Sequence, residues 1–261
     1  MNKKILLACI AVVFSFGVAT SSLASGVYVA PSSAKPYFNG AYIGVGGGVV
    51  QGLSDVESAY KQCHYTSVYL YSTHDFKSGG YGFNANIFAG YGKTFRSSYY
   101  LGGELFANYL SLKMKGSHDY YVIGPWDDLT MSTEVKNPYS FGGDARAGYL
   151  VSPRTMLYVL FGLDYARFNV KSEAQAKGWD SLSYKLITNE FNKWQLGLMP
   201  GIGMEVGLRD HVSLRTQYTY TFYSSFNHDV SLKADLATVN LKTKVKPQRS
   251  KFTIMLSYLF N

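Results

Sequence analysis

The sequence predicts an all-β fold: an eight-stranded antiparallel transmembrane β-barrel with three short periplasmic turns and four long extracellular loops. Three observations support this prediction. The chain begins with an export signal, its composition is rich in aromatic residues and poor in charge, and several segments are apolar at every second position. The final stretch shows the alternation most clearly, because one face of the extended strand carries Phe252, Ile254, Leu256, Tyr258 and Phe260.

The first 24 residues have the three parts of a secretory signal peptide. Lys3 and Lys4 give it a positive start, residues 5–18 are apolar, and small residues precede the expected cleavage site after Ala24. The predicted divisions of the chain are therefore a signal peptide at 1–24, a short periplasmic lead-in at 25–36 and an outer-membrane β-barrel at 37–261.

The composition narrows the class of protein further. Only 16% of the residues are charged, against about a quarter in a typical soluble domain, while the chain has 23 Tyr, 16 Phe and 26 Gly. No stretch after the signal contains 18 consecutive apolar residues, so no transmembrane helix is expected. The net charge of +8 is a modest excess that gives little support for a nucleic-acid partner. Cys63 alone remains after cleavage, so the mature fold does not depend on an internal disulfide.

Eight segments alternate with the period of a β-strand. They occupy residues 40–50, 81–95, 99–113, 139–151, 156–170, 191–208, 211–223 and 251–261. Tight turns are predicted at 96–98, 152–154 and 209–210, and long loops at about 51–79, 114–138, 171–190 and 224–249. About ten tilted residues cross the hydrocarbon layer, so each segment is long enough to span it.

The face opposite the apolar one is rich in glycine and carries sparse charges of both signs, which suits a narrow lumen. The heights of these charges above the tight turns predict a lower layer in which Glu104 and Glu205 meet Arg146 and Arg215. A second, higher layer is predicted from Asp144, Asp164 and Lys251. Buried charges must be paired. The network therefore either fills the lumen as a structural plug or lines a gated pore or proton path.

Two further features concern the outside of the barrel. Aromatic residues lie near the predicted turns and loops, where amphipathic rings favour the membrane interfaces. A basic run places Lys242, Lys244 and Lys246 on the same face as Phe252, with Arg249 nearby. If the last strand extends through this run, these residues contact lipopolysaccharide phosphates or another polyanion; the alternative is a solvated loop.

The exported chain, its glycine-rich opening strand, its eight segments and its alternating last strand resemble the OmpA-like outer-membrane β-barrel proteins, in particular the opacity or OmpX-like surface proteins of Gram-negative cells. The resemblance covers about residues 37–261. It implies recognition of the C-terminal strand by the barrel-assembly machinery, which reads an aromatic end; here Tyr258 and Phe260 match, followed by Asn261.

Three groups of residues are candidates for catalysis or metal binding. His211 and Ser213 have the His-x-Ser spacing of lipid A deacylase barrels, and their parity predicts that both point inward at the periplasmic end. Asp127-Asp128 with His228-Asp229 resemble the acidic and His pairs of omptin proteases. The residues Cys63, His64 and His74 match no compact metal site.

We therefore expect no catalytic residues, no metal and no cofactor. The predicted function is that of a monomeric outer-membrane surface protein with a structural or interaction role, through loops that contact lipopolysaccharide or host surface molecules. A small gated porin or channel is the alternative, and a lipid A-modifying or proteolytic enzyme is the third hypothesis.

Overall fold

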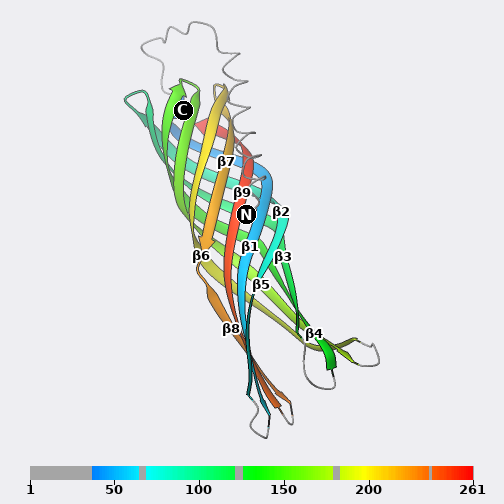
Figure 1. Cartoon of the computed structure of the whole chain (residues 1–261). Helices are drawn as coiled ribbons and strands as arrows, with labels where there is room; N and C mark the ends of the chain where they lie inside the picture. Colours follow the sequence, from blue (N-terminus) through cyan, green and yellow to red (C-terminus); the bar gives the residue numbers. More distant parts are fainter. Residues whose placement is uncertain (1–36, 65–68, 121–125, 179–182, 235–236, 261) are drawn as a thin grey trace.

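The computed structural model is a narrow barrel of long antiparallel strands (Figure 1). It describes residues 37–64, 69–120, 126–178, 183–234 and 237–260, so the predicted signal peptide and lead-in lie outside the described residues. The strands are β1 (Gly40–His64), β2 (Tyr69–Phe95), β3 (Tyr99–Tyr120), β4 (Trp126–Ser152), β5 (Thr155–Gly178), β6 (Ser183–Arg209), β7 (Val212–Tyr223), β8 (Phe226–Ala234) and β9 (Ala237–Phe260).

The predicted eight-stranded ring is confirmed. Each strand from β1 to β6 pairs with the next, and β9 pairs with both β7 and β1, which closes the ring. The short strand β8 follows β7 after a break at Ser224 and Ser225, and it pairs with β9. β7 and β8 are thus two parts of one position in the wall. Closure satisfies the backbone hydrogen bonds of every strand, as a membrane requires.

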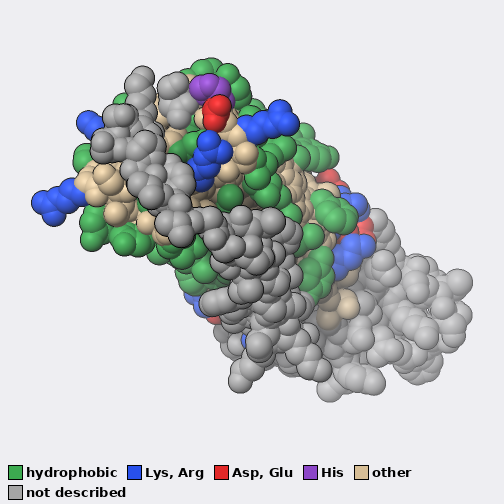
Figure 2. Space-filling model, turned by 90° about the horizontal axis from the view of Figure 1, so that it is seen from above, with side chains coloured by type: hydrophobic (Ala, Val, Ile, Leu, Met, Phe, Trp, Pro, Cys, Tyr) green, Lys and Arg blue, Asp and Glu red, His purple; other side chains and the backbone are tan. Residues whose placement is uncertain are grey.

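The barrel is apolar outside and polar inside, the reverse of a soluble barrel. Outward side chains such as Ile87, Leu105 and Val159 are 62%, 73% and 58% exposed, and hydrophobic side chains cover much of the flank in Figure 2. Inward positions on the same strands hold buried polar groups. An apolar outer band around a polar interior indicates a transmembrane barrel whose exterior contacts lipid.

The three predicted turns are present. Residues 96–98 connect β2 to β3, with Arg96 and Ser97 at φ values of 47° and 62°, in the left-handed region. The other two turns join β4 to β5 and β6 to β7. Short turns gather at the periplasmic end of outer-membrane barrels, so this end of the molecule, at the top of Figure 1, is periplasmic.

Most residues predicted as four long loops are strand instead. β1 continues to His64, and β3 continues to Tyr120, well past the predicted strand ends. The prediction was wrong because the apolar outer face ends where the membrane ends, so the alternation becomes invisible in the sequence. The pairing nevertheless continues, and inward residues such as Val56, Met114 and Val135 remain buried.

Beyond the membrane the barrel wall divides along two seams. The register between β2 and β3 ends at the pair of Gly79 with Lys115, and that between β6 and β7 ends at Gly197 with Tyr223. The distal strands therefore form two four-stranded sheets, which separate in the lower part of Figure 1. We call β2-β1-β9-β8 the first blade and β3-β4-β5-β6 the second blade. A hydrophobic cluster joins their bases and includes Val50, Val245 and Phe226 with Leu112, Met114, Val135 and Val170.

Candidate functional site

The lumen holds a group of buried ionisable side chains at inward positions of six strands. Each is at most 8% exposed, and they comprise four acids, Glu104, Asp144, Asp164 and Glu205, and four bases, Arg146, Arg215, Arg249 and Lys251. A lumen this narrow has little room for water, so these charges need partners among the side chains themselves.

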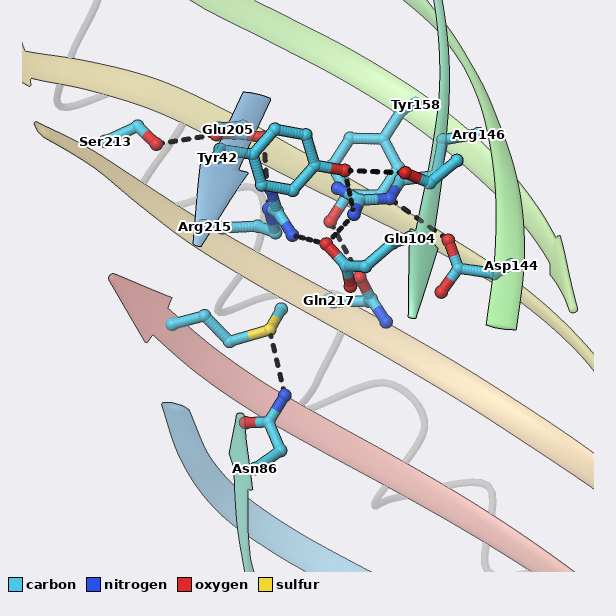
Figure 3. A network of polar contacts seen from close by, with 12 residues as sticks. Tyr42, Asn86, Glu104, Asp144, Arg146, Tyr158, Glu205, Ser213, Arg215 and Gln217 are labelled. Carbon is cyan, nitrogen blue, oxygen red and sulfur yellow. Dashed lines mark hydrogen bonds and ion pairs between the residues drawn. The ribbon is translucent and has the colours of Figure 1, made fainter. Parts of the chain in front are cut away.

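The four residues of the predicted lower layer lie together (Figure 3). The Arg215 Nη1 atom lies 2.8 Å from Glu104 Oε2, and its Nε atom lies 3.0 Å from Glu205 Oε2. Arg146 Nη2 contacts the same Glu104 oxygen, and Arg146 Nε lies 3.1 Å from Asp144 Oδ1. Glu104 therefore bridges two guanidinium groups, and Asp144 belongs to this layer as well.

Neutral side chains that were not predicted as members of this network complete it. Ser213 Oγ donates to Glu205 Oε1 at 2.6 Å, and Arg146 Nη2 donates to the Tyr42 hydroxyl at 2.7 Å. The Arg215 guanidinium also lies over the Phe88 ring, 4.7 Å from its centre. Their inward parity is the sequence signal that could have identified them, since all lie at alternate positions that face the lumen.

The predicted second layer has a different composition. Asp164 pairs with Arg249 and also accepts from the Tyr223 hydroxyl. Lys251 Nζ donates to Asn108 Oδ1 at 3.0 Å. The prediction that Asp144, Asp164 and Lys251 form this layer is therefore wrong, because Asp144 pairs below and Asp164 has an arginine as its partner.

Arg249 was predicted outside with the lysine run, but it is 2% exposed inside the lumen. The strand continues in register through Pro247, so Arg249 shares the inward parity of Lys251 and not the outward parity of the lysines. Lys244 and Lys246 do lie on the outer face, and their Nζ atoms are 3.5 Å and 2.5 Å from Glu57 carboxylate oxygens.

The hydrogen bond from Lys246 holds the pKa of Glu57 below its usual value. The side chain of Lys242 lies outside the described part of the chain.

Above and below the charged layers the lumen is filled by hydrophobic side chains. Along β3 alone, consecutive inward positions carry buried Tyr100, Glu104, Phe106, Asn108, Leu110, Leu112 and Met114, with only Gly102 among them lacking a side chain. At the periplasmic end Phe38 packs in a cluster with Tyr100, and the Tyr37 hydroxyl lies 2.6 Å from the Arg209 carbonyl oxygen across the barrel. The described lumen is thus a packed interior rather than an open bore.

The His211 and Ser213 arrangement differs from the expected one. His211 lies in the turn before β7, exposed, with its ring stacked on Tyr258, whereas Ser213 is buried and bonded to Glu205. The two side chains do not share the inward face that the sequence analysis assigned to them, because the strand begins only at Val212.

The other candidate groups fall on side chains outside the described part of the structure, although their strands are placed. Asp128 lies on the second blade, opposite Lys177, and His228 lies on the first, opposite Thr243. The side chains of Cys63, His64 and His74 also lie outside the described part of the structure. So do the side chains of aromatic residues within the predicted loops, namely Tyr60, Tyr65, Tyr69, Tyr71, Tyr120, Tyr121 and Trp126. Among the described residues, no group of three or more His, Cys, Asp or Glu could hold a metal. In the same part of the chain, none of the elements is a helix that could cross a bilayer.

Comparison with known proteins identifies the family. The model of the outer membrane protein β-barrel domain matches residues 16–260. The chain belongs to this family. It is accordingly an outer-membrane protein, as the fold and its apolar exterior indicate.

Three solved outer-membrane proteins resemble the chain at low sequence identity. The outer membrane protease OmpT from Escherichia coli is 7% identical, with a TM-score of 0.49, over 88% of this chain and 99% of that one. OprG from Pseudomonas aeruginosa is 13% identical, with a TM-score of 0.44, over 85% and 97%. Ail, the attachment invasion locus protein of Yersinia pestis, is 11% identical, with a TM-score of 0.27, over 77% and 98%. No curated protein matches the sequence.

Proposed function

We propose that this protein is a non-enzymatic surface protein of the outer membrane, whose barrel anchors two extracellular blades that contact other molecules. Its partners are lipopolysaccharide and surface molecules of a host, and the barrel acts as a monomer. The barrel-assembly machinery recognises its last strand, where Tyr258 and Phe260 point outward.

The observation that carries this proposal is the contrast between the two halves of the strands. In the membrane half, ion pairs around Glu104 and Arg215 lie between hydrophobic clusters and fill the lumen. Such a lumen favours an anchor over a channel. In the other half, strands such as β1, with 25 residues, extend well beyond the roughly ten needed to cross the hydrocarbon. Paired strands of this length hold a large surface rigidly outside the cell.

The outward lysines of β9 form one part of that surface. Replacing Lys242, Lys244 and Lys246 by Gln is expected to weaken binding of lipopolysaccharide or heparin-like polyanions at low salt, where screening is weakest. Because Glu57 lies against two of the three, the expected effect is modest. Arg249 is excluded from this surface by its place in the lumen.

Conductance and binding test the proposal together. The purified protein is placed in planar bilayers, and polyanion binding is measured on the same preparation in vesicles. We expect no large stable channels and measurable binding. Large stable channels would support the small-channel alternative instead, and hydrolysis of lipid A or peptide that His211→Ala or His228→Ala abolishes would support an enzyme.

A further inference from the structure

A row of aromatic side chains crosses the outer face of the second blade where it meets the membrane. Tyr109 packs against Tyr139 with ring centres 5.6 Å apart, and Tyr165 stacks on Trp194 at 5.1 Å with an interplanar angle of 13°. Phe141 lies between these pairs, 5.5 Å from Tyr165. All five rings are at least 39% exposed. Rings of this kind gather at the bilayer interface, so the row marks the outer edge of the hydrocarbon.

A row of cations lies level with the outermost of these rings and just beyond it, on the same outer face. The register places Lys113 of β3 directly opposite Lys136 of β4, and both point outward. Arg167 of β5 is the cross-strand neighbour of Trp194 and lies diagonally from Lys136, whose own partner is Asn169. Like charges directly opposite one another on a sheet are destabilising. The arrangement therefore calls for an anion to offset it.

The protein itself supplies few anions to this row. Glu134 lies 3.0 Å from Lys136 and 3.5 Å from Lys115, so one carboxylate serves two lysines. Within the described residues, neither Lys113 nor Arg167 forms an ion pair. The hydrogen bond from Lys136 holds the pKa of Glu134 below its usual value. Both oxygens of this carboxylate already pair with lysines, Lys115 and Lys136.

The backbone between the two rows is shaped by a bulge. The β3–β4 register shifts between Tyr109 and Leu112, and the β4–β5 register shifts between Lys136 and Ser140. Asn137, fully buried, holds the bulge: its Nδ2 atom donates to the Arg167 carbonyl at 2.9 Å, and its Oδ1 atom accepts from Arg249 Nη1 at 2.8 Å. Bulges redirect side chains and recur beside functional sites. The lumen network thus fixes the positions of the outer cations.

We propose that Lys113, Lys136 and Arg167, together with the aromatic row, bind the phosphorylated headgroup of a glycolipid in the outer leaflet. The cations bind the phosphate, with Arg167 able to donate two hydrogen bonds to it, while the rings contact the sugar and the start of the acyl chains. Because the aromatic row and the apolar band below it contact lipid, the ligand we propose carries hydrocarbon chains and is not free phosphate. This inference rests on the proposed function and moves its principal lipid contact from β9 to the second blade.

Lys244 and Lys246 provide a matched comparison on the first blade, for which a smaller loss is expected. They too are outward lysines beyond the membrane, but Glu57 lies between them and offsets their charge. If any cation at this height were sufficient, the two sets would bind alike. If the row on the second blade, where Glu134 contacts Lys136 but no acid pairs with Lys113 or Arg167 among the described residues, is the principal site, replacing Lys113, Lys136 and Arg167 costs more affinity than replacing Lys244 and Lys246.

The test compares variants of the full-length mature protein in detergent micelles. Binding of bisphosphorylated lipid A is measured by titration calorimetry for the wild type, for the triple variant Lys113→Gln, Lys136→Gln, Arg167→Gln, and for Lys244→Gln, Lys246→Gln. Each cation near an anionic surface contributes about fivefold, so the triple variant is expected to lose about a hundredfold in affinity. The comparison variant should also lose affinity, but by no more than about threefold, because Glu57 already offsets both lysines and an uncompensated cation contributes about fivefold.

Two further ligands distinguish the source of the phosphate. Dephosphorylated lipid A should bind as weakly as the triple variant binds the bisphosphorylated form, and inorganic phosphate should show no saturable binding. Equal losses in both variants, unchanged affinity in the triple variant, or saturable binding of inorganic phosphate would each overturn the inference. None of these outcomes changes the result expected in the conductance test, so the lipid site can be refuted without refuting the proposed function.

Discussion

The lower charged layer of the lumen makes a specific prediction about stability. Glu104→Gln removes one carboxylate that contacts both Arg146 and Arg215, while preserving the shape of the side chain. The side chains of these three residues are at most 3% exposed, so two guanidinium groups would remain buried with too little negative charge. Removing one partner of a buried ion pair costs about 3–5 kcal/mol. The unfolding equilibrium should therefore shift by about a hundred- to a few thousandfold.

Urea unfolding of the barrel in lipid vesicles, followed by tryptophan fluorescence, measures this shift. The matched control is Asp210→Asn, which breaks the exposed pair of Arg154 and Asp210 at 3.2 Å. The side chains of that pair are 55% and 85% exposed, and such pairs contribute about 0–1 kcal/mol. The double variant Glu104→Gln, Arg215→Met leaves three acids and three bases in the lumen, so it should be less destabilised than the sum of its single variants, with a coupling of about 0.5–3 kcal/mol. If Glu104→Gln costs no more than Asp210→Asn, or if the two lumen substitutions add, the reasoning fails.

Three further predictions follow from packing and pairing. Arg249→Gln should destabilise the barrel by about 3–5 kcal/mol in urea unfolding, because it leaves the buried Asp164 carboxylate without its cation. Lys246→Gln, which breaks an exposed pair, should cost less than about 1 kcal/mol. Equal effects of the two substitutions would contradict the inward position of Arg249. Gly48→Ala should prevent closure of the ring, because its Cβ would lie 1.9 Å from the Phe252 carbonyl oxygen. Gly47→Ala should fold, because the nearest atom to its Cβ would be 3.3 Å away. Heat-modifiable migration on gels distinguishes the folded barrel from the unfolded chain for both variants. Phe38→Ala should cost about 3–5 kcal/mol, since its ring is buried in the periplasmic cluster, and an unchanged urea midpoint would show that this cluster does not stabilise the barrel.

The membrane-spanning half of the fold was predictable from sequence because the lipid imposes a strict pattern. Every outward position there must be apolar, so the period of two is visible in segments such as residues 251–260, and the turns are marked by residues such as Pro153 and Asp210. The pattern ends at the bilayer surface. Beyond the membrane an outward position can be polar, as at Lys244, or apolar, as at Leu53. The alternation is therefore lost, and the continued strands could not be distinguished from loops.

The contacts within the lumen were only partly predictable. Parity assigns a residue to the inside, and height above a turn brought Glu104 together with Arg215 correctly. Height alone failed for Asp144, because adjacent strands are staggered in a tilted barrel and long arginine side chains reach across layers. Arg146 reaches both Glu104 and Asp144, which height counting had assigned to different layers. The bulge at Asn137 was also invisible, since it depends on a hydrogen bond to Arg249 from a strand 112 residues away in sequence.

Charge balance would have corrected the most consequential error. The charge network predicted for the two layers comprises four acids but only three bases, Arg146, Arg215 and Lys251, which leaves one negative charge in excess within these layers. An uncompensated buried carboxylate is costly enough to require a further inward cation. Of the basic residues near the last strand, Arg249 is the one that shares the parity of Lys251, and the structure pairs it with Asp164. Placing Arg249 outside with the lysines would have left Asp164 with only the Tyr223 hydroxyl as a donor, and a neutral donor cannot offset a full charge. The same residue donates to Asn137, so the requirement for neutrality inside the barrel also determines the bulge that positions the cations outside it.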